Sequence, residues 1–344
     1  MATQIGEIAS WDKTTQAQMD ELLISAGIRR DGHLDYSCGA FEDGELVAAG
    51  SSYHNTLRCM AVSPDHQGEG LMNQVVSHLM ERQVMLGNSH VFMYTKPQSA
   101  KMFGDLGFHE IARLDDLVFM ENRKEGFARW LKSLEPTRRE GRSAAIVMNA
   151  NPFTMGHRFL VERAAAENDA VHLFLLSEEA GPIPFAVRRR LARDGIADLP
   201  NVIFHESGPY IISSATFPSY FLPDGDTAIL AHAKLDLLLF GEIAKALNVS
   251  RRYAGEERSS HVTSLYNQVM AEQLPAAGVE FIELPRRELN GQVVSASTVR
   301  QAIHDGRLEE VAFMLPETTL SFFQSPEAAP VNAAIRAMKD PRHY

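Results

Sequence analysis

The sequence predicts an α/β protein with two domains, an α+β domain over residues 1–135 and a parallel-sheet domain over residues 136–344. The chain of 344 residues is long enough for two domains of ordinary size. In the first part, several strand-like runs are separated by short turns, which is typical of antiparallel strands. In the second part, strand-like and helical stretches alternate, which predicts a parallel sheet with helices on both faces.

The first domain is expected to contain both helices and strands. Asp43-Gly44, between two strand-like runs, is a strong hairpin signal. The expected strands are 36–42, 45–53, 56–62, 89–96 and 117–121, and the expected helices are 14–27, one that ends at residue 86, and 99–106. A linker is expected over residues 122–142, because this stretch carries many charges and is interrupted by Pro136 and Gly141.

The second domain is predicted to be a Rossmann-like parallel sheet. The expected strands are 144–149, 170–177, 201–206, 252–255 and 279–283, and the expected helices are 157–167, 185–198, 226–247, 262–274 and 296–304. Ligands of such sheets bind beyond the carboxyl ends of the strands. Polar side chains that directly follow a strand are therefore the first candidates for a binding site.

Composition argues against several classes of function. The net charge of −11 argues against a nucleic-acid partner. Cys38 and Cys59, the only cysteines, provide neither a disulfide framework nor a metal-type spacing. No apolar run approaches the ~20 residues that span a membrane, and the N-terminus does not resemble a signal peptide. We therefore expect a cytoplasmic protein without a membrane partner.

The first phosphate-type motif follows the apolar run 144–148. Residues 149–157 read as a tight turn that leads into a helix opened by Thr154-Met155-Gly156-His157. Such a turn directs backbone N–H groups and the positive end of a helix at an anion. Gly156 allows a phosphate to approach the backbone, and His157 and Thr154 can donate hydrogen bonds to it. The alternative is a structural histidine in a turn.

A second motif lies about one small domain downstream. Ser295, Ser297, Thr298 and Arg300 stand before or within the start of a predicted helix, where hydroxyl and N–H groups bind phosphate and an arginine neutralises charge. Such serines and threonines are otherwise helix caps. In this order, the two motifs resemble those of nucleotidyltransferases of the HIGH superfamily, which attack the α-phosphate of a nucleoside triphosphate and expel pyrophosphate.

The first domain resembles the GNAT acyltransferase family. Gln67, Gly68 and Gly70 match its glycine-rich loop, whose N–H groups bind the pyrophosphate of an acyl-coenzyme A. Met72 stands where that loop has a small residue, and Phe103 aligns with a frequent general-acid tyrosine. Phenylalanine cannot donate a proton. The resemblance therefore implies a domain that docks the pantetheine-like arm of a carrier protein, or one with a purely structural role.

Over its full length, the chain resembles the citrate lyase ligases. The segments that carry this resemblance are Asn149–His157, Pro184–Arg188, Asp198–Val202, Arg252–Glu257 and Glu288–Arg300, behind the GNAT-like domain. The resemblance implies that ATP and acetate acetylate the thiol of a phosphoribosyl-dephospho-coenzyme A arm on the acyl-carrier subunit of citrate lyase, by way of acetyl-AMP. AMP and diphosphate leave, Mg²⁺ accompanies ATP, and citrate lyase is activated.

The same resemblance assigns roles to individual residues. His157 would stabilise the transition state at the α-phosphate, and Thr154 would orient a phosphate oxygen. The expected ATP-binding residues are Asn149, Asn151, Phe153, Gly156, Arg188, Gly255, Glu256, Ser295, Ser297, Thr298 and Arg300. Gln67, Gly68 and Gly70 would hold the carrier arm. Glu256 and Glu257 follow a strand beside Gly255 and would meet adenosine or a metal, or instead cap the next helix. Lys234 and Asp236 are further candidate contacts, and no carboxylate is assigned to Mg²⁺.

Three other functions fit parts of this pattern. A coenzyme-type adenylyltransferase would join AMP to a phosphopantetheine-like phosphomonoester without acetate. A GNAT acetyltransferase with a nucleotide-sensing module is another alternative, but Met72 and Phe103 argue against it. A regulatory protein would bind the acyl carrier without turning over ATP, which does not explain two intact phosphate motifs.

Overall fold

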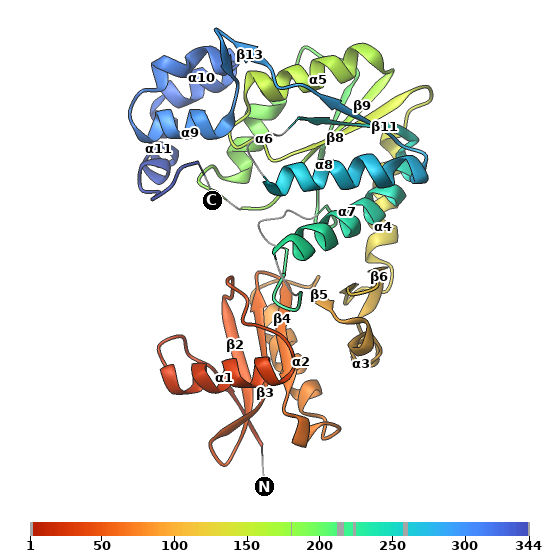
Figure 1. Ribbon diagram of the computed structural model, residues 1–344, viewed down its shortest axis with the longest axis vertical. Coiled ribbons are helices and arrows are strands. Elements are labelled where there is room, and N and C mark those ends of the chain that lie inside the picture. Colours follow the sequence, from red (N-terminus) through yellow and green to blue (C-terminus); the bar gives the residue numbers. More distant parts are fainter. Residues whose placement is uncertain (1–2, 180, 212–216, 223–224, 257–260, 343–344) are drawn as a thin grey trace. The chain divides into compact units, whose positions relative to one another are not determined.

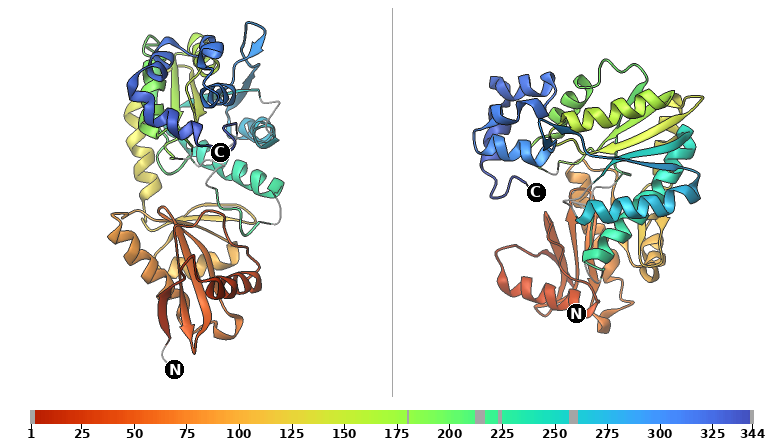
Figure 2. Two further views of the ribbon diagram at one scale, coloured as in Figure 1. Left: turned by 90° about the vertical axis from the view of Figure 1, so that its left-hand side faces the viewer. Right: turned by 45° about the horizontal axis from the view of Figure 1, so that its top comes forward.

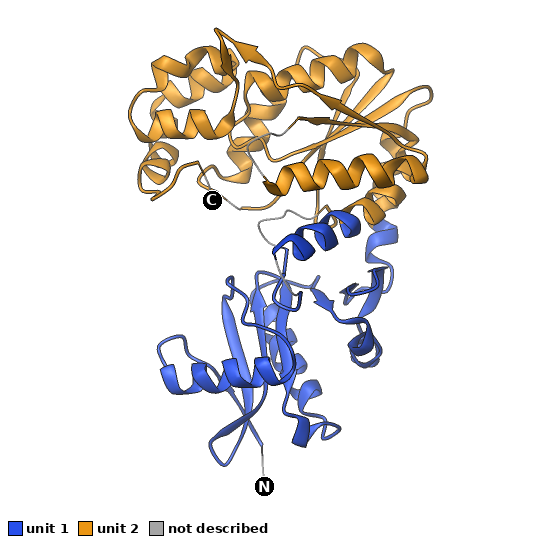
Figure 3. Cartoon of the chain, viewed as in Figure 1, with its two compact units in different colours: residues 1–129, 217–235 blue, residues 130–216, 236–344 orange. Residues whose placement is uncertain are grey.

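The computed structural model describes residues 3–179, 181–211, 217–222, 225–256 and 261–342. The chain forms two compact units (Figure 3). The first contains Met1–Arg129 and Phe217–Leu235, and the second contains Trp130–Thr216 and Asp236–Tyr344. The division after Arg129 lies close to the expected boundary at residue 135. The return of residues 217–235 to the first unit was not part of the sequence prediction.

The first unit is built on a seven-stranded sheet with the order β1-β2-β3-β4-β5-β7-β6 (Figure 1). Its strands are β1 (Gln4–Glu7), β2 (Tyr36–Glu42), β3 (Glu45–Tyr53), β4 (Thr56–Val62), β5 (Phe92–Thr95), β6 (His109–Arg113) and β7 (Val118–Glu121). All neighbours pair antiparallel except β4 and β5, which are parallel. The sheet and the hairpin at Asp43-Gly44 agree with the predicted α+β fold, and the edge strands β1 and β6 are additions to it.

Helices cover both faces of this sheet. They are α1 (Lys13–Ser25), α2 (Leu71–Met85) and the short α3 (Ala100–Asp105). Ala48 and Ala49 are adjacent on β3, and their side chains therefore point to opposite faces. Ala48 packs in a core with Val75 of α2, whereas Ala49 packs in a core with Met19 of α1. The α1 face and the α2 face thus have separate hydrophobic cores.

The second unit contains a five-stranded sheet in which every neighbouring pair is parallel. The strands, in sheet order, are β10 (Val202–Glu206), β9 (Ala170–Leu175), β8 (Ser143–Met148), β11 (Val249–Gly255) and β12 (Glu280–Leu284). A hairpin of β13 (Glu288–Leu289) and β14 (Gln292–Val293) follows. The predicted Rossmann-like sheet is confirmed, with its strands close to the expected positions.

Helices cover both faces of the second sheet as well (Figure 2). The helices of the rest of the chain are α4 (Gly126–Leu134), α5 (Met155–Glu167), α6 (Phe185–Asp194), α7 (Gly225–Leu247), α8 (His261–Gln273), α9 (Ala296–His304), α10 (Glu317–Gln324) and α11 (Ala329–Arg336). Residues of α5, α6 and α9–α11 share one core with β8 and β9. In the described part of the chain, no helix combines the length and the apolar character needed to cross a membrane.

A buried pair of histidines lies within this sheet. His172 of β9 and His205 of β10 are 2.9 Å apart between Nδ1 and Nε2. Burial, together with the charge of Arg139, lowers the pKa of His172 to about 4. Burial and the neighbouring His172 likewise lower the pKa of His205 to about 4. The folded protein therefore holds both imidazoles neutral at pH 7, as expected for histidines with a structural role.

This pair is expected to make the second unit less stable in mild acid. An unfolded histidine has a pKa of about 6.5, so the unfolded chain takes up protons below that pH while the folded chain does not. The free energy of unfolding is highest above pH 6.5 and falls as the pH drops toward 4, by on the order of 2 kcal/mol for each of the two histidines between pH 7 and pH 5. Urea unfolding at both pH values measures this loss. A His172→Phe/His205→Leu variant with an equally large loss would contradict the assignment.

Candidate functional site

The first phosphate-type motif forms the connection between β8 and α5. β8 ends at Met148, and Thr154 is the N-cap residue of α5. The Thr154 hydroxyl accepts the N–H of His157 at 3.4 Å, which ties the cap to the first turn of the helix. The start of α5 thus lies at the carboxyl end of the central strand, where its unpaired N–H groups can meet an anion.

Two hydrogen bonds fix the ring of His157. The backbone N–H of Thr154 donates to Nδ1 at 3.0 Å, and the Thr154 hydroxyl lies 2.9 Å from the same nitrogen. Because Nδ1 accepts a hydrogen bond, the proton of the neutral ring belongs on Nε2. Burial, together with the charge of Arg286, lowers the pKa of His157 to about 4. At pH 7, His157 is therefore a neutral imidazole whose Nε2–H can donate to a phosphate oxygen.

The turn before Thr154 contains a buried amide that the fold does not satisfy. Asn151 is 2% exposed, and among the described residues neither Oδ1 nor Nδ2 has a hydrogen-bond partner. A buried polar group left in this state costs about 1–3 kcal/mol, so a ligand that pairs with it would gain affinity. Phe153 is completely buried and stacks on His157 with ring centres 5.7 Å apart. Its position supports the histidine rather than a direct contact with ATP.

Arg188 is buried within the fold, where it binds backbone carbonyls. Its guanidinium is 0% exposed and donates to the carbonyl and the side chain of Asn149 at 2.8 and 2.9 Å. It also donates to the carbonyls of Leu176 at 2.9 Å, Ile183 at 3.2 Å and Glu178. These contacts fasten the loops after β8 and β9. The structure thus places Arg188 as a positioning residue behind Asn149, which differs from the expected contact with phosphate.

The second motif lies beside the first. Ser295 is the N-cap residue of α9, and its hydroxyl lies 2.7 Å from that of Ser297. Neither hydroxyl caps the helix in the described structure, and Thr298 is exposed. Val294 lies next to Gly156, since a Cβ on this glycine would be 3.5 Å from the valine side chain. The structure therefore brings the starts of α5 and α9 together at one edge of the sheet.

Arg300 links the two motifs from within the fold. It is 5% exposed and donates to the carbonyl of Asn151 at 2.5 Å. It also donates to the carbonyls of Pro341 at 2.7 Å and Arg342 at 2.8 Å, near the end of the chain. Like Arg188, this arginine holds a loop of the site in place through backbone carbonyls, which differs from the expected contact with phosphate.

A third part of the site follows β11 and β12. Gly255 is the last residue of β11 and pairs with Leu284, the last residue of β12. Glu256 donates its N–H to the Leu284 carbonyl at 2.7 Å, and its own carbonyl accepts Nε of Arg286 at 3.1 Å. Arg286 was missed in the sequence, although it follows a strand at the edge where ligands bind. Its positive charge is one of the two causes that lower the pKa of His157.

The remaining candidates fall outside this group. Glu257 lies outside the described residues. Asp236 is buried and forms an ion pair with Arg252 of β11, 3.3 Å between Oδ2 and Nη2. Lys234 is exposed on α7. No cluster of three or more His, Cys, Asp and Glu side chains suited to a metal occurs in the described parts of the chain.

The first unit has a cavity of its own between β4 and β5. The two strands pair only through Thr56–Phe92 and Leu57–Met93, and their later residues line a cavity of about 690 Å³. Gln67, Gly68 and Gly70 line it as well. Gly68 and Gly70 have φ angles of +87° and +77°, which favour glycine, and Gly70 is the N-cap of α2. The loop thus presents the first N–H groups of α2 to the cavity.

Two departures from the GNAT pattern also line this cavity. Met72 is 8% exposed and packs into the core of the α2 face, so that the loop accommodates its bulk. Phe103 of α3 is 3% exposed and supplies an apolar wall where the family has a proton donor. The cavity therefore combines the glycine-rich loop at the start of α2 with an apolar side chain at position 103.

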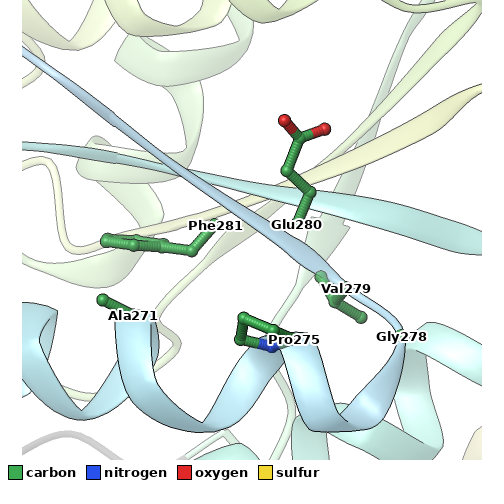
Figure 4. Close-up of a pocket in the computed structure, with 6 residues that line it drawn as sticks. All are labelled: Ala271, Pro275, Gly278, Val279, Glu280 and Phe281. Atoms are coloured by element: carbon green, nitrogen blue, oxygen red, sulfur yellow. The ribbon is translucent and has the colours of Figure 1, made fainter.

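A smaller pocket of about 410 Å³ lies elsewhere in the second unit (Figure 4). Its lining residues are Ala271, Pro275, Gly278, Val279, Glu280 and Phe281. Glu280 and Phe281 are the first residues of β12, so this pocket lies at the amino edge of the sheet. The two phosphate motifs lie at the carboxyl edge, which separates this pocket from the site.

Comparisons with known proteins match both units. Residues 143–323 match the family model of the citrate lyase ligase C-terminal domain, and residues 4–108 match that of the acetyltransferase (GNAT) family. A citrate (pro-3S)-lyase ligase of Klebsiella pneumoniae is 39% identical over 318 residues, covering 90% of this chain and 93% of the relative. Those of Haemophilus influenzae and Escherichia coli are 34% and 35% identical, covering 92% and 90% of this chain and 98% and 90% of the relatives.

Proposed function

The chain belongs to the citrate lyase ligase family, and we propose on this premise that it acetylates the prosthetic-group thiol of the citrate lyase acyl-carrier subunit. As a member of this family it is a ligase. The proposed reaction consumes ATP and acetate, proceeds through acetyl-AMP and releases AMP and diphosphate. The observation that carries the proposal is the edge of the second sheet, where the neutral His157, the unsatisfied Asn151 and the start of α9 lie together.

The first step forms a mixed anhydride. A carboxylate oxygen of acetate attacks the α-phosphorus of ATP, the bond from that phosphorus to the bridging oxygen of diphosphate breaks, and diphosphate leaves. Acetate is already ionised at pH 7, so the attack requires no general base. Nε2–H of His157 donates to an oxygen of the α-phosphate, where negative charge grows in the transition state. Mg²⁺, brought by ATP, offsets the charge of the triphosphate.

The other residues of the site have supporting roles in this proposal. The hydroxyls of Ser295 and Ser297 and the N–H groups of α9 bind the diphosphate. Arg286 neutralises charge beside His157. Gly156 leaves room for the α-phosphate. A Cβ at this position would meet neighbouring side chains of the fold only at ordinary van der Waals distances. Arg188 and Arg300 act indirectly, because both hold the loop that carries Asn151.

The second step transfers the acetyl group to a thiol. The thiol releases its proton to water, the thiolate sulfur attacks the acetyl carbon, the bond from that carbon to the phosphate oxygen breaks, and AMP leaves with the electron pair. The protein's own cysteines are poor acceptors. Burial raises the pKa of Cys38 and of Cys59 to about 12, and a buried thiol of high pKa is inert. The acceptor is therefore the thiol of the carrier arm, which Gln67, Gly68 and Gly70 hold at the first unit.

Acetate-dependent exchange of labelled diphosphate into ATP, with Mg²⁺ and without carrier protein, tests this proposal. Exchange that requires acetate is expected, because the first step is reversible before any thiol is present. Exchange that ignores acetate but depends on a phosphopantetheine-like phosphomonoester would replace the proposal by a coenzyme-type adenylyltransferase. Absence of exchange with either acceptor, even after the carrier subunit is added, would exclude adenylation altogether.

A further inference from the structure

A segment from the second half of the sequence forms part of the cavity in the first unit. Tyr220 and Phe221 line this cavity together with residues of β4, β5 and the Gly68–Gly70 loop. The segment Phe217–Leu222 belongs to the same compact unit, although about a hundred residues of chain separate it from β7. A GNAT-type cavity therefore contains a wall that the GNAT-type sequence, residues 4–108, does not encode.

Hydrogen bonds and ring contacts hold this wall in place. The backbone N–H of Arg29 donates to the Tyr220 carbonyl at 2.8 Å, and its guanidinium donates to the carbonyls of Leu222 at 2.9 Å and Ser219 at 3.4 Å. The ring of Phe217 meets Tyr94 of β5 edge-on, with centres 5.6 Å apart. These contacts fasten the segment both to the loop after α1 and to the sheet.

The wall lies on the opposite face of the sheet from the anion-binding loop. Tyr220 is 7% exposed and packs in the core of the α1 face with Met19 and Cys59. Leu71, which begins α2 after the Gly68–Gly70 loop, packs in the core of the α2 face. The gap between β4 and β5 thus connects the two faces. A phosphate held by the loop on one face directs the rest of a linear ligand toward Tyr220 and Phe221 on the other.

A second contact borders the same side of the cavity. Nζ of Lys96, just after β5, donates to the carbonyls of Gly27 at 2.9 Å and Ala26 at 3.2 Å, which follow α1. Ala26 and Lys96 also line the cavity. A volume of about 690 Å³ lies within the range of sites that enclose one small ligand. Transfer to an amine would require a second reactant next to the thioester at the far end of that ligand.

We propose that Phe217–Leu222 determines the specificity of this cavity, because it leaves room for one linear thiol arm of the pantetheine type and lines the end at which an amine acceptor would have to approach a thioester. The cavity then holds the arm, and the acetyl group comes from the adenylate formed in the second unit. This inference rests on the proposed function for the identity of the arm. In this cavity the thiol receives an acetyl group and no acyl group leaves it. No proton donor for a departing thiol is therefore needed, which explains why phenylalanine can stand at position 103.

Titration with coenzyme A tests the wall, with 4′-phosphopantetheine as the shorter probe and ADP as the control for the nucleotide alone. Phe221→Ala is expected to weaken coenzyme A binding by about tenfold, because the arm loses an apolar wall. Phe221→Leu should lie between Phe221→Ala and the wild type, and it provides the answer if Phe221→Ala does not fold. Met85→Ala, which removes a side chain 78% exposed in the same unit, is the matched control. Equal affinity of the wild type and both Phe221 variants would overturn the proposal.

A second experiment tests the acceptor side. Acetyl-coenzyme A is incubated with the wild-type protein and a panel of primary amines and peptides, and release of free thiol is followed. No amine-dependent release is expected, whereas such release would overturn the proposal. Diphosphate exchange on the same preparation keeps the two inferences apart. Exchange without coenzyme A binding would contradict the proposed role of the cavity and leave the proposed adenylation intact. Binding without exchange would contradict the proposed adenylation and leave the role of the cavity intact.

Discussion

His157→Ala is expected to lower acetate-dependent diphosphate exchange by ~10²–10³-fold, the usual loss when one donor to a developing negative charge is removed. In the structure, Nε2 is the ring nitrogen of His157 that can donate to a ligand. Its Nδ1 is engaged by Thr154, and its Nε2 carries the proton of a ring that stays neutral because its pKa is lowered to about 4. Alanine removes the acceptor of the Thr154 N–H at the helix cap, which costs about 0.5–2 kcal/mol of stability, so the larger loss should appear in turnover.

Exchange rates and thermal unfolding of the same preparations measure these two effects. The matched control is His304→Ala, because His304 is at the other end of α9 and bonds its neighbour Asp305 at 2.8 Å. Near-normal exchange in His157→Ala would remove this histidine from the mechanism. The pH profile gives an independent check. An inflection near pH 6.5 that disappears in His157→Ala would show that the ring titrates normally and is not held neutral.

Arg188→Met is expected to lower the free energy of unfolding of the second unit by at least about 3 kcal/mol. The guanidinium is fully buried and donates to carbonyls at the ends of two neighbouring strands. Methionine fills part of the volume but leaves those carbonyls without a donor. Asn149 also loses the contact that fixes its side chain, so exchange should fall in the fraction that remains folded.

Urea unfolding followed by the fluorescence of Trp130 measures this effect, because Trp130 packs on Tyr210 within the second unit, with ring centres 5.1 Å apart. Trp11, the other tryptophan, is 83% exposed and should change little. Arg189→Met is the control, since the Arg189 side chain is 44% exposed and pairs with Glu206 at the surface, where such pairs contribute about 0–1 kcal/mol. If Arg188→Met is as stable as the wild type but binds ATP poorly, Arg188 is a phosphate ligand after all.

The parts of the fold that follow local rules could be predicted from the sequence. Alternating strands and helices gave the parallel sheet, and the turn chemistry at Asp43-Gly44 gave the hairpin. The two phosphate motifs were found because each combines a strand end with a helix start. The edge strands β1 and β6 lack such signals, since each is only four or five residues long. The pairing with their neighbours, and not their own composition, makes them strands.

The arginines show why the site itself was harder to predict. Arg188 and Arg300 stand beside phosphate motifs, and the sequence does not reveal that backbone carbonyls of distant loops need a donor at their positions. Arg286 shows the opposite case, a basic residue outside both motifs that the sheet brings toward His157. Phe153 was also expected to contact ATP, and the structure buries it instead. Its burial depends on Gly195, where any Cβ would collide with the phenylalanine ring.

The assignment of Phe217–Leu235 to the first unit has a consequence for how this protein can be divided and how it can evolve. A fragment that stops near residue 135 would lose Tyr220, and the apolar surface that it covers in the core of the α1 face would face water and favour aggregation. Gene fission between the two halves would produce the same damage. The first unit therefore cannot be separated from the rest by one cut in the chain, and a fragment that preserves it must include residues 217–222.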